Sequence, residues 1–211
     1  MDKKNYSLFT EGIIAQIEKQ GVKPTLLLQV CCAPCSSYVM EYLSRYFDIT
    51  LYFYNPNISP ESEYTFRLEE LRRLTTELPE ARGVKLSEGE YNHQAFLDMA
   101  RGLETLPEGG ERCRRCYALR LTDTAKKAKA EGFDWFTTTL SISPHKNADW
   151  LNEIGEGLQQ EYGVPYLFSD FKKKNGYKRS IELSRQYNLY RQDYCGCAFS
   201  KATRTLEKCD D

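Results

Sequence analysis

Residues 26–37 read LLLQVCCAPCSS, so an apolar run leads into three cysteines and then into a helical pattern. The apolar run predicts a buried strand and the spacing after Pro34 predicts a helix, which places the cysteines where a strand becomes a helix. Pro34 suits a first helical turn, where its missing N–H costs nothing. Ligands bind at the carboxyl ends of parallel strands, and helix starts favour thiolates. We therefore expect chemistry at this turn.

Strand and helix patterns alternate along the rest of the chain, which predicts an α/β fold with a parallel sheet and helices on both faces. The expected strands cover residues 26–30, 49–54, 83–86, 133–140 and 165–168. The expected helices cover 6–19, 61–78, 92–103, 148–162 and 179–187. Three more are expected: one that follows Pro34, one that ends at about Glu131 and one that ends near Glu207. No repeat or low-complexity linker divides the chain, so we expect one domain over residues 1–211.

Charge and hydropathy restrict the classes of partner. The 211 residues include 29 basic and 30 acidic side chains, a net charge of −1, so a polyanion would have to meet a local basic patch rather than a global field. No apolar run approaches the roughly 20 residues of a membrane span. The N-terminus also lacks an apolar signal core. These features predict a cytoplasmic protein without a membrane partner.

Seven of the eight cysteines fall into three groups. We name them the turn cysteines (Cys31, Cys32 and Cys35), the CxxC pair (Cys113 and Cys116) and the CxC pair (Cys195 and Cys197). Thiolate sets suit zinc or iron–sulfur clusters rather than hard cations. Neither pair completes a site alone, so we expect both to converge on the Cys31–Cys35 turn. Cys209, in a charged tail, is expected to be an ordinary solvated thiol.

The number of thiols predicts more than one metal. One tetrahedral zinc or one four-iron cluster takes four ligands, which leaves three of the seven without a role. Neighbouring residues such as Cys31 and Cys32 are expected to point apart and to serve two centres. A cluster with an adjacent ion explains the count. A single closed zinc site with additional thiols is the structural alternative.

Two other functions fit parts of the pattern. Cys32-Ala33-Pro34-Cys35, between a strand and a helix, is similar to the active site of thiol–disulfide oxidoreductases. Such an enzyme needs two cysteines and leaves five unexplained. An ATP-using nucleotide-binding domain would need phosphate-cradling glycines that this first turn lacks.

Five motifs spread in order over most of the chain resemble the cobalamin-independent epoxyqueuosine reductase family, QueH. They are VCCAPC at 30–35, YNPNI at 54–58, RCRRCY at 112–117, TTTLSISPHKN at 137–147 and YCGC at 194–197. The resemblance implies a Rossmann-like fold of the adenine nucleotide α-hydrolase type. It also implies reduction of epoxyqueuosine to queuosine at the wobble position of a tRNA anticodon, the last step of queuosine biosynthesis. Some members carry aspartate where this chain has Cys35.

The resemblance further implies a four-iron–four-sulfur (4Fe-4S) cluster beside a mononuclear iron. We expect Cys32 and the CxxC pair to bind the cluster, with Cys195 as the remaining ligand or as a bridge. Cys31, Cys197 and Cys35 would then hold the second iron, which keeps an open position and acts as a Lewis acid. The expected partners are the tRNA and a low-potential electron donor of the ferredoxin or flavodoxin type.

Several residues outside the cysteine groups are candidates for catalysis or substrate binding. His145 follows a predicted buried strand and is the candidate general acid, although a capping role is the competing interpretation. The predicted substrate-binding residues are Asn55, Asn57, Arg112, Arg115, Ser143 and Lys146. Asn147 is a candidate helix cap. The basic run 172–179, KKKNGYKR, is the candidate tRNA patch, although such runs are more often solvated faces.

Overall fold

The computed structural model describes residues 4–207, and the side chains of residues 4–203. The helices are α1 (Tyr6–Gln20), α2 (Ala33–Leu43), α3 (Glu61–Glu77), α4 (His93–Ala100), α5 (Glu111–Glu131), α6 (Ala148–Tyr162), α7 (Gly176–Gln186) and α8 (Ala198–Glu207). The strands are β1 (Thr25–Gln29), β2 (Asp48–Phe53), β3 (Lys85–Glu88) and β4 (Trp135–Thr138). Two short 3-10 turns, η1 (Pro79–Ala81) and η2 (Thr139–Ile142), follow α3 and β4. Cys209 lies outside the described residues.

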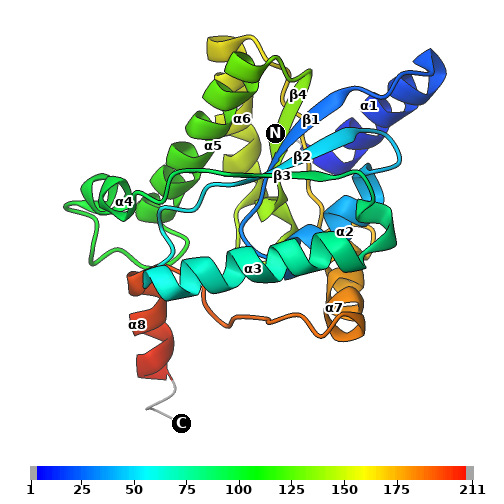
Figure 1. Cartoon of the computed structure of the whole chain (residues 1–211). Coiled ribbons are helices and arrows are strands. Elements are labelled where there is room, and N and C mark those ends of the chain that lie inside the picture. Colours follow the sequence, from blue (N-terminus) through cyan, green and yellow to red (C-terminus); the bar gives the residue numbers. More distant parts are fainter. Residues whose placement is uncertain (1–3, 208–211) are drawn as a thin grey trace.

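The described strands form one parallel sheet in the order β3-β2-β1-β4 (Figure 1). Central β1 pairs with both neighbours, so that Leu28 lies opposite Leu51 on one side and Thr137 on the other. Its apolar composition suits a strand that is covered on both faces. Because the strands are parallel, their carboxyl ends share one edge, and β1 leads from that edge into the turn cysteines.

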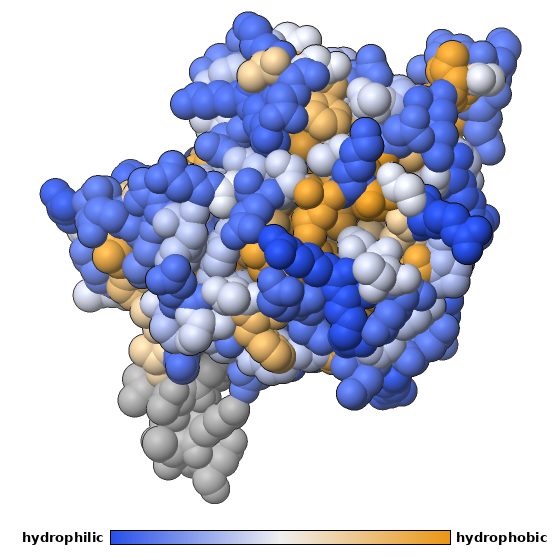
Figure 2. Space-filling view, viewed as in Figure 1, coloured by the Kyte–Doolittle hydropathy of each residue, from blue (hydrophilic) through white to orange (hydrophobic). Residues whose placement is uncertain are grey.

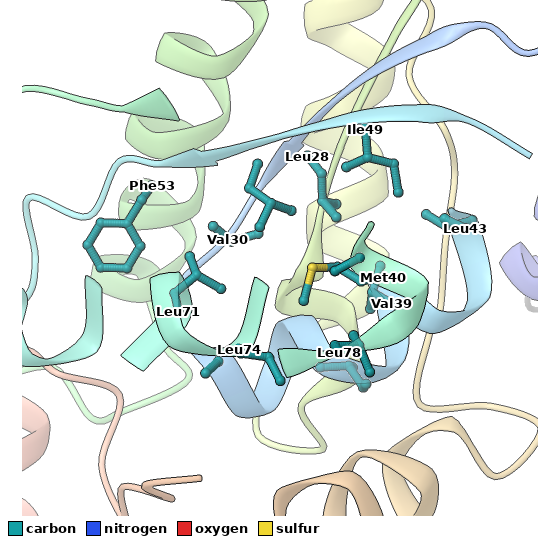
Figure 3. Packing of buried hydrophobic residues seen from close by; sticks show 14 of the residues in the cluster. Leu28, Val30, Val39, Met40, Leu43, Ile49, Phe53, Leu71, Leu74 and Leu78 are labelled. Carbon is teal, nitrogen blue, oxygen red and sulfur yellow. The ribbon is translucent and has the colours of Figure 1, made fainter. Parts of the chain in front are cut away.

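Side chains of β1 alternate between two cores. Leu26 and Leu28 belong to the core that includes α2, α3 and α7, as Figure 3 shows for Leu28 facing Met40. Leu27 points the other way, into the core that α5 and α6 share. This alternation follows from the two-residue period of a strand. The predicted parallel sheet with helices on both faces is confirmed.

One predicted strand is wrong. Residues 165–168 make a single bridge, in which Tyr166 pairs with Phe136 in parallel, and they do not form a full strand. Pro165 has no N–H to give to a ladder. Beyond the bridge, the amide N–H of Ser169 donates to the side chain of Asn152 in α6 at 2.9 Å. The Asn152 side chain thus competes for this amide, and the pairing with β4 does not continue beyond the bridge.

The strand predicted over 133–140 is shorter than expected. It becomes a 3-10 turn at Thr139, because the Thr138 hydroxyl accepts a hydrogen bond from the Leu140 N–H at 3.1 Å. Side-chain capping of this kind competes with a strand ladder. The turn points the following loop, which contains His145, toward the carboxyl edge.

The surface in Figure 2 is mostly hydrophilic, and hydrophobic side chains gather near the middle of the view, over the sheet region of Figure 1. Within residues 4–207, no helix has both the length and the apolar character needed to cross a bilayer.

Candidate metal centre

The turn cysteines lie at the start of α2. Cys32 is the N-cap residue with extended backbone angles, and Pro34 occupies the first turn, as the sequence predicts. The sulfur atoms of Cys31, Cys32 and Cys35 all lie within 4.8 Å of one another. Three converging sulfurs at one helix start form a thiolate set that suits a soft metal.

The expectation that Cys31 and Cys32 point apart is wrong. Their sulfur atoms are 3.6 Å apart. Alternation of neighbouring side chains belongs to regular strands, and β1 ends at Gln29, before either cysteine. The irregular backbone between Gln29 and α2 brings both sulfurs to the same side. Orientation at this turn therefore does not separate the two residues into different centres.

Helix α5 presents the CxxC pair from its first two turns. Cys113, Cys116, Tyr117 and Arg120 share one face of α5, because positions i, i+3, i+4 and i+7 align along a helix. The Gly109 N–H donates to the Cys113 sulfur at 3.3 Å. The loop before α5 therefore holds this sulfur in place through a backbone donor.

The CxC pair lies in the connection between α7 and α8, and its two sulfurs are 3.4 Å apart. Gly196 between them has a positive φ of 110°. A Cβ atom there would lie 3.0 Å from the Ile58 side chain and 3.1 Å from Arg67. The Gly196 carbonyl oxygen accepts a hydrogen bond from the Ser59 N–H at 2.9 Å. Only glycine combines this backbone with so close an approach.

The cysteines of all three groups line one cavity of about 190 Å³. Segments that are about 80 residues apart in the chain thus bring their sulfurs to one place, at the carboxyl edge of the sheet. The donor set consists of soft sulfur atoms, so it fits zinc or iron–sulfur chemistry and is unsuited to magnesium or calcium. The residues present therefore fit a thiolate-bound metal centre.

The electrostatics of the turn cysteines favour one thiolate at neutral pH. Hydrogen bonds from Cys32 and Cys35 hold the pKa of Cys31 well below its usual range, and the charges of Arg120 and Arg67 add to that effect. The same Cys31 thiolate raises the pKa of Cys32 to about 12 and also raises that of Cys35. Metals displace such shared protons, because thiolates are the ligating form.

The CxC pair behaves in the same way. A hydrogen bond from Cys197 lowers the pKa of Cys195 to about 5, and the nearby Lys146 ammonium assists. Burial raises the pKa of Cys116, which faces the same cavity, to about 11. The turn cysteines and the CxC pair therefore each carry one thiolate that is suited to bind a metal.

A lysine at the wall of the cavity balances this negative charge. The side chain of Lys146 is 11% exposed, and its Nζ lies 3.6 Å from a carboxylate oxygen of Glu108. Burial acts to lower the pKa of Lys146, but Cys195, Tyr117 and Glu108 together raise it. Lys146 therefore stays cationic at the wall of the cavity.

Most of the predicted substrate residues line the cavity. Asn57, Arg112, Ser143 and Lys146 do so, and the buried Oδ1 atom of Asn57 has no hydrogen-bond partner among the described residues. A buried acceptor without a partner, on a residue that lines a cavity, is suited to a ligand's donor. Arg112 also donates to the carbonyl oxygens of Leu103, Glu104 and Leu106, so it holds the loop before α5.

Asn55 and Arg115 do not line the cavity. The Asn55 amide donates to the Val30 carbonyl at 2.9 Å and accepts from Arg120 at 2.6 Å, so it braces the turn from behind. Arg115 is exposed and forms an ion pair with Glu111 at 3.2 Å, one turn earlier in α5.

His145 is exposed and lines both the cavity and a neighbouring cleft of about 700 Å³. The three residues common to the two spaces are Pro144, His145 and Lys146. Asn147, just after them, caps α6 by accepting from the Trp150 N–H at 3.1 Å, so its capping role is confirmed.

Four lysines line the neighbouring cleft besides Lys146: Lys4, Lys172, Lys173 and Lys174. Lys172 is paired with Asp170 at 2.6 Å and Lys174 with Glu11, so part of this charge is balanced. Arg179, at the end of the basic run, forms a bidentate pair with Glu41 of α2. The run therefore divides into a lysine segment at the cleft and a structural arginine.

Two buried arginines near the cysteines lie outside the five sequence motifs. Arg67 in α3 is 1% exposed, and Arg120 in α5 is 3% exposed. The charges of both act on Cys31. Arg120 was detectable from its helical spacing behind the CxxC pair, whereas only the tertiary packing brings Arg67 near.

The comparisons with known proteins agree with the site. The family model for "Epoxyqueuosine reductase QueH" matches residues 26–203. A Staphylococcus epidermidis protein of that name is 46% identical over 209 residues, which cover 97% of this chain and 88% of the relative. A Streptococcus pyogenes serotype M1 relative is 45% identical over 97% of this chain and 81% of its own length, and a Thermotoga maritima relative is 36% identical over 85% and 92%. The chain therefore belongs to the epoxyqueuosine reductase QueH family.

Proposed function

We propose that this chain reduces the epoxide of epoxyqueuosine in a tRNA anticodon to the alkene of queuosine, using a 4Fe-4S cluster and an adjacent iron. The observation that carries the proposal is the convergence of three cysteine groups on one cavity. Family membership supports the substrate, because the relatives are named for that reaction. The number of thiols supports two metals, since one closed centre uses four.

The proposed ligand assignment divides the thiols between the two centres. Cys32 and the CxxC pair, with Cys195, would hold the cluster, and Cys31, Cys35 and Cys197 would hold the second iron. When bound, these groups supply electrons singly and a Lewis acid with an open position. The enclosing walls, which include Leu140 and Ile142, keep water away from the reacting carbon atoms.

The reaction requires two electrons and two protons, and it releases the epoxide oxygen as water. The chain must therefore hold the substrate and deliver protons. The orphan Oδ1 of Asn57 is suited to accept a hydrogen bond from a substrate hydroxyl or ammonium group. His145, at the rim where the cavity meets the cleft, is the proposed general acid, and Lys146 supplies a positive charge that stabilises the departing oxygen.

The lysine-lined cleft is the proposed entry for the anticodon loop. It joins the cavity along Pro144, His145 and Lys146, so a strand that lies in the cleft brings one base to the cysteines. Lysines bind phosphates, and an overall charge of −1 leaves such binding to a local patch. The electrons would come from a ferredoxin- or flavodoxin-like donor, because iron–sulfur clusters accept electrons at low potential.

Anaerobic purification with iron and sulfide analysis tests this proposal. We expect iron and acid-labile sulfide in the wild-type protein, and formation of queuosine from epoxyqueuosine tRNA detected by nucleoside mass spectrometry. Cys116→Ser and Cys113→Ser should each lose most of the sulfide and the activity, because a cluster loses a ligand. Cys209→Ser, outside the three groups, is the control and should retain both.

Other results would point to the alternatives. Zinc without sulfide would indicate the closed zinc site. A metal-free protein that cycles between a dithiol and a disulfide at Cys32 and Cys35 would indicate the oxidoreductase. Full sulfide content in both CxxC variants would refute the ligand assignment.

A further inference from the structure

Arg120 occupies an unusual position for a charged side chain. It is 3% exposed and lines the cavity together with all three cysteine groups. One guanidinium nitrogen donates to Asn55 Oδ1 at 2.6 Å, while the buried Nε has no hydrogen-bond partner among the described residues. An isolated buried charge is strongly unfavourable unless an anion or a set of dipoles compensates it.

The other buried cations near the cavity are compensated. Arg67 forms an ion pair with Glu63 at 2.7 Å, and Lys146 lies 3.6 Å from Glu108. Arg112 donates to three carbonyl oxygens. Arg120 has neither arrangement: in the part of the chain whose side chains are described, it makes no ion pair with a carboxylate, and its one hydrogen-bond acceptor is a neutral amide.

The groups that line the cavity with Arg120 include all seven thiols of the three groups, and its charge also acts on the phenol of Tyr54. Cys116 lies one helical turn before it on the same face of α5, and Cys31 lines the same cavity. Asn55, which is itself anchored to the Val30 carbonyl, holds one nitrogen of the guanidinium in place. Because no described carboxylate pairs with Arg120, the cavity is the place where a compensating anion would bind.

We infer that Arg120 is the counter-cation of the thiolate-bound metal centre and sets its reduction potential. This inference rests on the proposed function. A cluster with four thiolate ligands is anionic and becomes more so on reduction, so a fixed buried cation at the wall of the cavity stabilises the reduced state. Arg120 thereby makes the centre easier to reduce, and it acts as a positioning residue that need not touch the substrate.

The test is a redox titration of the anaerobically purified protein, with the reduced cluster followed by electron paramagnetic resonance. At the wild-type midpoint potential, half of the centre is reduced. In Arg120→Gln the ratio of reduced to oxidised centre at that potential should fall at least about tenfold, equivalent to about 59 mV for one electron. Arg120→Lys keeps the charge and should restore most of the wild-type ratio. Lys126→Gln, an exposed change on the same helix, is the control and should not move the potential.

A second variant guards against misfolding of Arg120→Gln. Asn55→Asp leaves Arg120 in place but puts a carboxylate against it, which cancels its charge and should lower the potential in the same direction. Wild-type potentials in both variants, with iron and sulfide intact, would overturn the inference and leave the proposed function standing. A wild-type protein without a metal centre would overturn both.

Discussion

His145 and the cysteines illustrate how much depends on single side chains in this protein. Each cysteine group contributes sulfur atoms to one cavity. Binding a metal is not yet catalysis, so catalysis depends also on the residues around the sulfur atoms. His145 lies exposed at the rim, and its backbone N–H donates to the Ser143 hydroxyl oxygen at 3.3 Å. The role proposed for His145, protonation of the departing oxygen, is compatible with this exposed position beside the cleft.

His145→Gln should slow the formation of queuosine by roughly 10² to 10⁴, because a general acid contributes about that factor. Iron and sulfide should remain at wild-type levels, since no metal ligand is removed. Single-turnover assays with preloaded tRNA separate this chemical step from binding. A variant with the wild-type single-turnover rate would show that another group, or water, protonates the oxygen.

At the scale of elements, one buried network fixes the carboxyl edge of the sheet. The Gln29 amide donates to the carbonyl oxygens of Val30 and Tyr54, each at 3.1 Å, and accepts from the Thr138 hydroxyl at 2.7 Å. It thereby ties β1 to β4 and to the loop after β2. Buried networks of this kind stabilise one geometry when every group is satisfied.

Gln29→Met should lower the free energy of unfolding by about 2 to 4 kcal/mol, because several buried groups lose their partners. The turn cysteines begin two residues after Gln29, so iron binding should weaken as well. Urea denaturation of the metal-free protein measures the stability change. Gln16→Met, on the exposed side of α1, should stay within about 0.5 kcal/mol of wild type. Equal urea midpoints for Gln29→Met and Gln16→Met would contradict a stabilising role for this network.

At the scale of the whole molecule, basic charge is local rather than global. The chain has a net charge of −1, yet five lysines line the cleft beside the cavity. Phosphate binding at this cleft would position a nucleic acid strand without reading its sequence. Recognition of the modified base would then fall to the cavity.

Changing Lys172, Lys173 and Lys174 to glutamate should weaken tRNA binding by more than about tenfold at moderate salt. The slope of log affinity against log salt should fall by about 2, because about 0.7 is lost per phosphate contact to a single strand. Filter binding over a salt series measures both quantities. The matched control reverses Lys19, Lys126 and Lys129, which line neither space and change the net charge equally. Equal effects in both triple variants would mean that only the global charge matters.

Local patterns were enough to predict the sheet, the strand-to-helix turn with Pro34, and the helix cap at Asn147. These features depend on hydrophobic periodicity and on backbone chemistry within a few residues, which a sequence displays directly. The motif set also led to the family, which the comparisons confirm. The predicted strand over 165–168 was wrong because the Asn152 side chain of α6, 17 residues earlier in the chain, accepts the hydrogen bond of the next amide, that of Ser169.

The tertiary structure alone decided which groups meet. The distances between the cysteine groups depend on how α2, α5 and the connection to α8 pack, and the common direction of Cys31 and Cys32 depends on irregular backbone after β1. Asn55 braces the turn, and Arg120 is a buried charge without a carboxylate partner. Neither role was visible in the sequence, because burial and hydrogen-bond partners depend on which residues pack together. The sequence therefore determined the elements and the ligand chemistry, whereas packing determined the electrostatic environment of the site, because charges interact through space and not along the chain.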